Sequence, residues 1–209
     1  ELRHKVQTAD LQLTVAKRSK STEKAGALKQ QIDLWKRTID DLEDLVSKTV
    51  MAIFAKRFKD SHESIRVLSL DSLAAYCRSR PDLFVNNTHL KYTGWMLCDE
   101  NSAVRLAAIQ GLTTAFHSAS QKSALKSIID RYLSRLADCT LDVDLVVQEK
   151  AMELLLLLMR EDFFDEIDQD HNIWEQINNR ALEQNASPAL RRGALYFVIG
   201  QLESFDEGA

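Results

Sequence analysis

An internal repeat constrains the fold of this chain more than any other feature. Four polar residues recur at intervals of 39, 43 and 43 residues, and each opens the same short pattern. The four are Asp60, Asp99, Asp142 and Asn185. After each of them an aliphatic residue follows at the fifth position, Arg or Gln at the sixth, a small residue at the ninth and another aliphatic residue at the thirteenth. Repeats of this length are supersecondary units that bury their apolar faces by stacking on their neighbours.

The period and the pattern match HEAT-type helix pairs. The small residue lets two helices approach closely, and the aliphatic residues fill the layer between repeats. We expect each Asp or Asn to cap the second helix of its pair, and the Arg to reach back to acceptors in the neighbouring repeat. Pro81 and Pro188 stand where helices would begin. The sequence therefore predicts an all-α fold whose body, residues 56–209, is a HEAT-type α-solenoid.

Composition agrees with helices and excludes several other classes. The 209 residues include only 6 Gly and 2 Pro, too few to turn a many-stranded sheet. The longest apolar run, Leu154–Met159, is far shorter than a membrane span, and no signal peptide precedes it. We interpret Glu1 as an internal position of a longer protein. Cys77, Cys98 and Cys139 fit neither a disulfide framework nor a zinc site, so we expect reduced thiols in an intracellular protein.

Residues 1–55 have a different periodicity. Apolar residues alternate at spacings of four and three, as in the a/d seam of a coiled coil. The first run is Leu2, Val6, Ala9, Leu13 and Ala16; the second is Leu28, Ile32, Trp35, Ile39, Leu42, Val46 and Ile53. A charged, Ser-rich stretch between the runs, residues 17–26, suits a chain reversal. We predict a long antiparallel coiled-coil helical hairpin. One long broken helix packed on another neighbour is the alternative.

The net charge of −4 is unevenly divided, with +4 on residues 1–60 and −8 on residues 61–209. An acidic body argues against wrapping of nucleic acid but leaves room for a local basic surface. The candidates are Lys17, Arg18, Lys20 and Lys24 at the hairpin tip, and Lys56, Arg57 and Lys59 at the end of the second arm. These residues either complement a helix C-terminus or contact phosphates without reading bases.

Catalytic and cofactor motifs are absent from the sequence. The 5 His are scattered without a ligand pair, and the 6 Gly are isolated, so no phosphate loop is present. The acidic run at residues 161–170 lacks the order of an EF-hand, and we interpret it as a solvated loop, with a metal site as the alternative. The sequence predicts no enzyme, no cofactor, no metal, no membrane partner and no small-molecule substrate.

The most unusual local segment is LKYTGW, residues 90–95. On a helix, Lys91 and Trp95 share a face, and Gly94 opens space beside the indole. The Trp is either a core residue or a binding hot spot, and the sequence leaves both open. With Tyr92 it would form an apolar and cationic patch of the kind that binds aromatic peptides. In a solenoid the matching helix of the next repeat lies alongside and carries Arg131, Tyr132 and Arg135.

Two stretches carry a resemblance to a known family. KRFKDSHESIRVLSLDSL (residues 56–73) and DLFVNNTHLKYTGWMLCDENSAVRLAAIQGL (residues 82–112) resemble the stromalin conservative domain. This domain belongs to the stromal-antigen, HEAT-repeat subunit of cohesin. The resemblance is clearest over residues 50–160 and continues more weakly to about residue 205. Family members are several times longer, and the upstream hairpin is similar to their long N-terminal helices.

The resemblance implies a non-enzymatic scaffold of the nucleus and the chromosome. It implies binding to the kleisin subunit, a contribution to double-stranded DNA binding, and roles in sister-chromatid cohesion and chromosome organisation. It also implies a surface that docks aromatic-x-Phe motifs of regulators such as shugoshin and an insulator zinc-finger protein. Carried over position by position, this surface comprises Lys91, Tyr92, Trp95, Arg131 and Tyr132.

Two positions depart from the vertebrate relatives. Tyr132 replaces a Phe, which keeps the ring and adds a hydroxyl, and Asn87 replaces an acid at the rim. Two other functions remain as alternatives. One is a generic HEAT-repeat protein-interaction adaptor outside chromosome biology, and the other is a nucleic-acid-binding module acting through the basic hairpin.

Overall fold

The computed structural model describes residues 1–18, 22–119, 123–161, 163, 173–183 and 186–206, and all regular structure within them is helical. The predicted all-α class is therefore confirmed. The chain divides into two compact units, Glu1–Ile53 and Phe54–Ala209. Each unit is described by itself.

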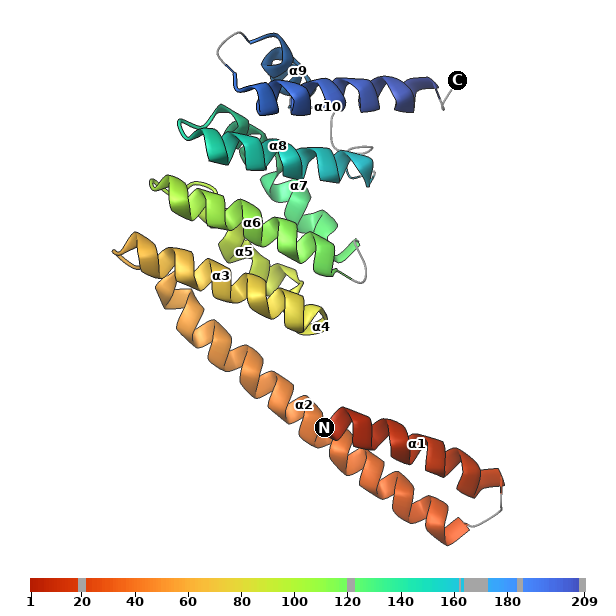
Figure 1. The fold of residues 1–209 in the computed structure, drawn as a ribbon. Helices are drawn as coiled ribbons and strands as arrows, with labels where there is room; N and C mark the ends of the chain where they lie inside the picture. Colours follow the sequence, from red (N-terminus) through yellow and green to blue (C-terminus); the bar gives the residue numbers. More distant parts are fainter. Residues whose placement is uncertain (19–21, 120–122, 162, 164–172, 184–185, 207–209) are drawn as a thin grey trace. The chain divides into compact units, whose positions relative to one another are not determined.

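The first unit consists of α1 (Leu2–Arg18) and most of α2 (Thr22–Arg57), which lie side by side (Figure 1). Val6 and Ala9 are buried against Ile32, with three partly buried residues of the two helices around them. Ion pairs join Arg3 to Glu43 and Asp10 to Lys36, so the two helices run antiparallel. The coiled-coil character of this pair stays a prediction.

The predicted seam on α2 is only partly covered. Leu42, Val46 and Ile53 are 45–54% exposed. Arg3, at the start of α1, already lies opposite Glu43. Val46 and Ile53 lie further along α2 than the residue opposite the start of α1, so no described helix of this unit covers them.

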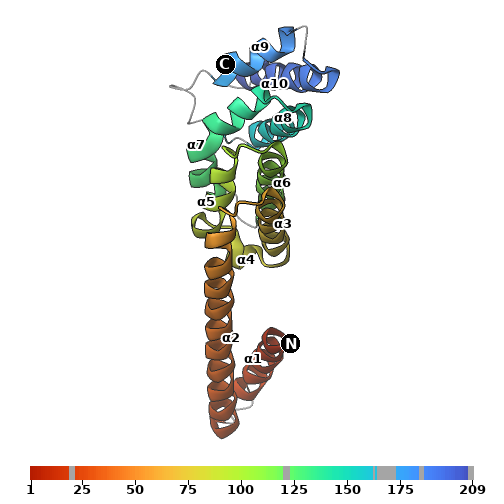
Figure 2. The ribbon, with the colours of Figure 1, turned by 90° about the vertical axis from the view of Figure 1, so that its left-hand side faces the viewer.

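The second unit is a stack of helix pairs in two layers (Figures 1 and 2). One layer contains α3 (Glu63–Ser79), α6 (Ser102–Ser118), α8 (Leu145–Arg160) and α10 (Pro188–Asp206), each packed on the next. The other contains α5 (Asn87–Met96), α7 (Ser123–Asp138) and α9 (Ile173–Leu182). The short α4 (Pro81–Phe84) and a 3₁₀ turn, Cys139–Leu141, lie in the connections. This arrangement is the predicted α-solenoid.

The repeated Asp and Arg residues form a ladder between repeats. Arg66 donates from Nε and Nη2 to the carboxylate of Asp99, at 2.8 Å each. Arg105 donates in the same way to Asp142, at 2.6 Å each. All four side chains are 6–9% exposed. Contact with a neighbouring repeat is as expected, but each Arg reaches the following repeat rather than back to the preceding one.

The prediction that the repeated Asp caps a helix is wrong by two residues. Each Asp carboxylate accepts the backbone N–H two positions further on, in the pairs Asp60–His62, Asp99–Asn101 and Asp142–Asp144. The caps of α6 and α8 are the second members of the last two pairs. The carboxylates of Asp99 and Asp142 already bind the Arg of the preceding repeat. Asn185 lies outside the described residues.

Both prolines begin helices as predicted. Pro81 is the first residue of α4, and Pro188 is the first residue of α10. Ser187 Oγ accepts the N–H of Leu190 at 3.1 Å, which is the geometry of an N-cap.

The three cysteines are free, and only Cys98 is exposed. Burial raises the pKa of Cys77 to about 12 and that of Cys139 to about 11. These two behave as packing thiols, as expected. Among the described residues, no helix is both long and apolar enough to cross a membrane. Almost all of the acidic run at residues 161–170 lies outside the described part of the chain.

Candidate peptide-docking site

Helix α5 carries the centre of the site, and its start is sharply defined. Asn86 Oδ1 accepts the N–H groups of Thr88 and His89, at 3.0 and 3.3 Å. His89 is buried, lies edge-on to Phe84, and has Nδ1 2.9 Å from the same Asn86 oxygen. These contacts fix the rotation of α5 and so decide which of its side chains face outward.

Three aromatic rings form a continuous platform. The buried Phe58 stacks on Tyr92, with ring centroids 4.8 Å apart and planes within 7° of parallel. Tyr92 in turn meets Trp95 edge-on at 5.2 Å. The Trp95 side chain is 44% exposed. Of the two interpretations left open by the sequence, the structure therefore favours a surface Trp over a core Trp.

Two ammonium groups lie over the exposed indole. Lys59 Nζ and Lys91 Nζ are each 5.9 Å from the Trp95 ring centroid, and Lys91 Nζ is 5.1 Å from that of Tyr92. These distances are within the range of cation–π attraction. The predicted sharing of one face by Lys91 and Trp95 is therefore observed.

Helix α7 packs beside α5, as the repeat pattern predicted. The hydroxyl of Tyr132 donates to the carbonyl oxygen of Lys91 at 3.3 Å. A Cβ atom on Gly94 would overlap the Tyr132 ring. The space beside the indole that Gly94 was expected to open is thus filled by this phenol. Arg131 is exposed on the same helix.

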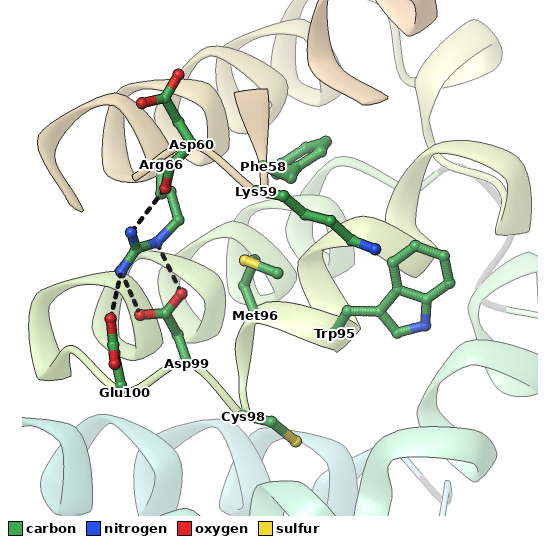
Figure 3. Close-up of a pocket in the computed structure, with 9 residues that line it drawn as sticks. All are labelled: Phe58, Lys59, Asp60, Arg66, Trp95, Met96, Cys98, Asp99 and Glu100. Atoms are coloured by element: carbon green, nitrogen blue, oxygen red, sulfur yellow. Dashed lines mark hydrogen bonds and ion pairs between the residues drawn. The ribbon is translucent and has the colours of Figure 1, made fainter. Parts of the chain in front are cut away.

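A pocket of about 380 Å³ adjoins the platform (Figure 3). Its apolar side is made by Phe58, Trp95 and Met96, and its polar side by Asp60, Arg66, Asp99 and Glu100, with Lys59 and Cys98 completing the lining. Its volume is at the lower end of the roughly 300–1,000 Å³ of ligand sites. The lining residues come from the segment that follows α2, from α3, from α5 and from the turn after α5.

Sequence reasoning missed Phe58, Met96, Cys98 and Glu100 as lining residues. Phe58 could have been recognised from the sequence, because it lies in RFKD (residues 57–60), within the first of the two stretches that carry the family resemblance. Met96, Cys98 and Glu100 follow Trp95 in the chain but belong to no recognisable pattern, and only the fold of the turn brings them to the pocket.

The predicted basic residues are divided between the two units. Lys17, Arg18 and Lys24 are exposed near the connection between α1 and α2, whereas Lys20 lies outside the described residues. Lys56 is exposed at the end of α2, and Arg57 pairs with Asp60 at 2.8 Å. Lys59 lies at the Trp95 ring instead. No group of three or more metal-ligating side chains occurs in the described part of the chain.

The second unit is an open stack of helix pairs with an aromatic pocket on one of its repeats. These features are typical of a helical-repeat scaffold protein. The family model of the stromalin conservative domain matches residues 59–133, which include every residue of the α5–α7 site. The chain therefore carries a stromalin conservative domain and resembles the stromalin subunits of cohesin.

Individual relatives agree with this assignment. Sister-chromatid cohesion protein 3 of Arabidopsis thaliana is 28% identical over 137 residues, covering 66% of this chain and 12% of that protein. Cohesin subunit SA-1 of Xenopus laevis is 27% identical over 120 residues, covering 57% of this chain and 10% of the relative. The chain thus matches only about an eighth or less of the length of these relatives.

A solved structure shares the fold. The cohesin subunit Scc3 from Z. rouxii aligns with 95% of this chain and 23% of its own, with a TM-score of 0.75 and 22% sequence identity.

Proposed function

We propose that this chain is a non-enzymatic docking segment of a cohesin subunit, acting in the nucleus on chromosomes. In this proposal Lys91, Tyr92, Trp95, Arg131 and Tyr132 bind aromatic-x-Phe motifs of cohesin regulators. The observation that carries the proposal is the exposed Trp95 ring with two ammonium groups 5.9 Å from its centroid, beside a pocket of about 380 Å³. Large aromatic residues next to Arg or Lys are typical of binding hot spots.

The chemistry of the site suits such a motif. A Phe or Tyr ring of the ligand would contact the Trp95 face and displace water from it, while Phe58 and Tyr92 hold the indole in place from beneath. Lys91 and Arg131 would pair with acidic groups that flank the motif. The platform is already packed in the unliganded chain, so little ordering would be needed on binding.

The relatives named above from Xenopus laevis and Z. rouxii are cohesin subunits. We extend two of the properties implied by the family resemblance to this chain. We propose that it contributes to the contact with the kleisin subunit and to sister-chromatid cohesion. We also propose that the basic residues Lys17, Arg18, Lys20, Lys24, Lys56 and Arg57 contribute to binding of double-stranded DNA, with Lys59 shared between DNA and the docking site.

The docking proposal is tested by fluorescence polarisation with a labelled aromatic-x-Phe peptide. Wild type is compared with Trp95→Ala, and with Tyr196→Ala as a control that removes an aromatic ring of similar exposure from α10. Each titration is run with and without a kleisin segment, and thermal melts are recorded alongside. We expect Trp95→Ala to weaken binding by more than about 1 kcal/mol, or more than about fivefold, with little change in Tm.

The outcomes separate the interpretations. Binding that is lost only in Trp95→Ala supports the docking site, and binding seen only with kleisin makes the site composite. If no peptide binds and Trp95→Ala melts far below wild type, the ring is structural and the docking proposal fails.

DNA binding is tested by the salt dependence of duplex affinity. Each Lys→Ala change that removes a phosphate contact should lower the slope of log K against log salt by about 1, with no base preference. Equal slopes for wild type, Lys24→Ala and Lys56→Ala would contradict a role for these two residues.

A further inference from the structure

The charges around the pocket are segregated between two opposite rims. Lys59 and Lys91 surround the Trp95 side, and Glu100 lies across the pocket from the indole (Figure 3). We propose that the pocket selects a motif with oppositely charged flanks, placing a basic side chain at Glu100 and an acidic one at Lys59 and Lys91. This inference rests on the proposed function, because it concerns the same pocket, and it specifies the charge pattern of the ligand.

The rim beside Trp95 is positively charged. Both ammonium groups lie 5.9 Å from the indole centroid, and in the described part of the chain neither is engaged in an ion pair. A carboxylate of a ligand would find these cations without having to break an existing pair.

The opposite rim carries an available negative charge. The Glu100 side chain is 91% exposed, and its nearest cationic atom, Arg66 Nη2, is 3.9 Å away. The Arg66 guanidinium is engaged elsewhere, because it donates two hydrogen bonds to Asp99 and others to the carbonyls of Asp60 and Ser61. The charge of Arg66 is balanced by Asp99, so Glu100 gives this rim a net negative charge.

A peptide that crosses the pocket would meet both rims. Its aromatic side chain would contact Trp95, and its flanks would extend in opposite directions. Complementary charges at exposed rims mainly set orientation, association rate and salt dependence, and each such pair contributes modestly to affinity. The segregation therefore gives the site a preferred direction for the bound chain.

The test uses two labelled peptides of identical composition and a neutral one. The first places two lysines before an aromatic-x-Phe core and two glutamates after it, the second reverses these flanks, and the third has serines in both. We expect one charged peptide to bind wild type about two- to fivefold more tightly than the other. The difference should disappear near 1 M salt, where the Debye length is about 3 Å.

Substitutions at the rim identify the residue responsible. Glu100→Gln should narrow the difference between the two charged peptides, and Glu100→Lys should narrow it further. Glu175→Lys, an equally large charge change at an exposed position on α9, should leave it unchanged. Thermal melts confirm that the exposed substitutions leave the fold intact.

Different results would contradict the charge inference and the docking function on which it rests. Equal affinities for the two charged peptides, or a difference between them that Glu100→Lys leaves unchanged, would overturn the inference, while Trp95-dependent binding of the neutral peptide would still support docking. Absence of binding by all three peptides would overturn the docking function, and the inference with it.

Discussion

The Tyr132 ring fills the volume that a side chain at position 94 would need. Through this contact Gly94 lets α7 approach α5 closely, and the phenol hydroxyl bonds to the α5 backbone at Lys91. The spacing of the two helices that carry the docking residues thus depends on the absence of one methyl group.

Gly94→Ala should destabilise the solenoid by up to about 2 kcal/mol. Overpacking against the ring costs about 1–3 kcal/mol, and the gain of about 1 kcal/mol in helix propensity offsets only part of it. Urea denaturation followed by circular dichroism measures the change. Gly26→Ala is the matched control, since a Cβ there meets open space, and it should stabilise its helix slightly.

A double-mutant cycle isolates the cause. In a Tyr132→Ala background the ring is gone, so Gly94→Ala should become neutral or stabilising. An undiminished cost in that background would show that the clash with Tyr132 is not the reason for the loss.

Arg105→Met should cost about 3–5 kcal/mol of unfolding free energy, because it leaves the buried Asp142 carboxylate without its guanidinium. Adding Asp142→Asn should recover part of the loss, since the amide oxygen can still accept the N–H of Asp144. Lys150→Met, which breaks an exposed pair with Glu153, serves as the control and should cost less than about 1 kcal/mol. Similar losses for the buried and the exposed pair would contradict a structural role of the ladder.

The same ladder predicts loss of stability in acid. Burial opposes ionisation of Asp142, but hydrogen bonds from Arg105 and the Asp144 N–H outweigh it and hold the pKa below the ordinary 3.8. Because the folded pKa is lowered, this contribution is complete above about pH 4 and declines as the pH falls through the folded value. In Arg105→Met the decline should be smaller.

His89 should make the free energy of unfolding depend on pH in a range above that of Asp142. Burial, and secondarily the charge of Lys91, lower its pKa below the ordinary 6.5. The unfolded chain therefore binds the proton first, and stability declines as the pH falls from 6.5, by at most about 1.4 kcal/mol per pH unit. His89→Gln should flatten this decline between about pH 6.5 and 5, measured by denaturation at each pH. His117→Gln, at an exposed site, should leave the decline intact.

Cys98 should be the one thiol that reacts readily with a chromogenic disulfide reagent in the native chain. Burial holds Cys77 and Cys139 as protonated, inaccessible thiols, whereas Cys98 is exposed in the lining of the pocket. We expect one equivalent of released thiolate per native chain and three after unfolding. Saturating aromatic-x-Phe peptide should slow the native reaction several-fold, and no protection would place the peptide elsewhere.

The repeat architecture was predictable from the sequence because its determinants are local. Aliphatic residues at helical spacing, small residues at close helix contacts and prolines at helix starts act within each repeat. The same period correctly placed Tyr132 beside α5. The role of Asp99 was not predictable in this way, because its carboxylate is bound by Arg66 from a different repeat.

The pocket was harder to predict for a related reason. Phe58, Arg66 and Glu100 come from three separate segments, and none of them belongs to a motif that specifies a ligand. The exposed second half of the α2 seam was missed as well, since the heptad spacing of Leu42 and Val46 fixes a face but not the register of its partner. Such features depend on tertiary contacts between segments rather than on local periodicity.

The Arg66–Asp99 ion pair has a consequence for how the pocket is held open. It joins the start of α3 to the turn after α5, and both of these segments line the pocket together with Phe58 and Trp95. Its two hydrogen bonds of 2.8 Å connect these two sides of the pocket within the chain itself. A peptide would therefore meet a pocket whose two sides are already joined by this pair. Discrimination between peptide motifs would then depend on the size of the inserted side chain as much as on charge.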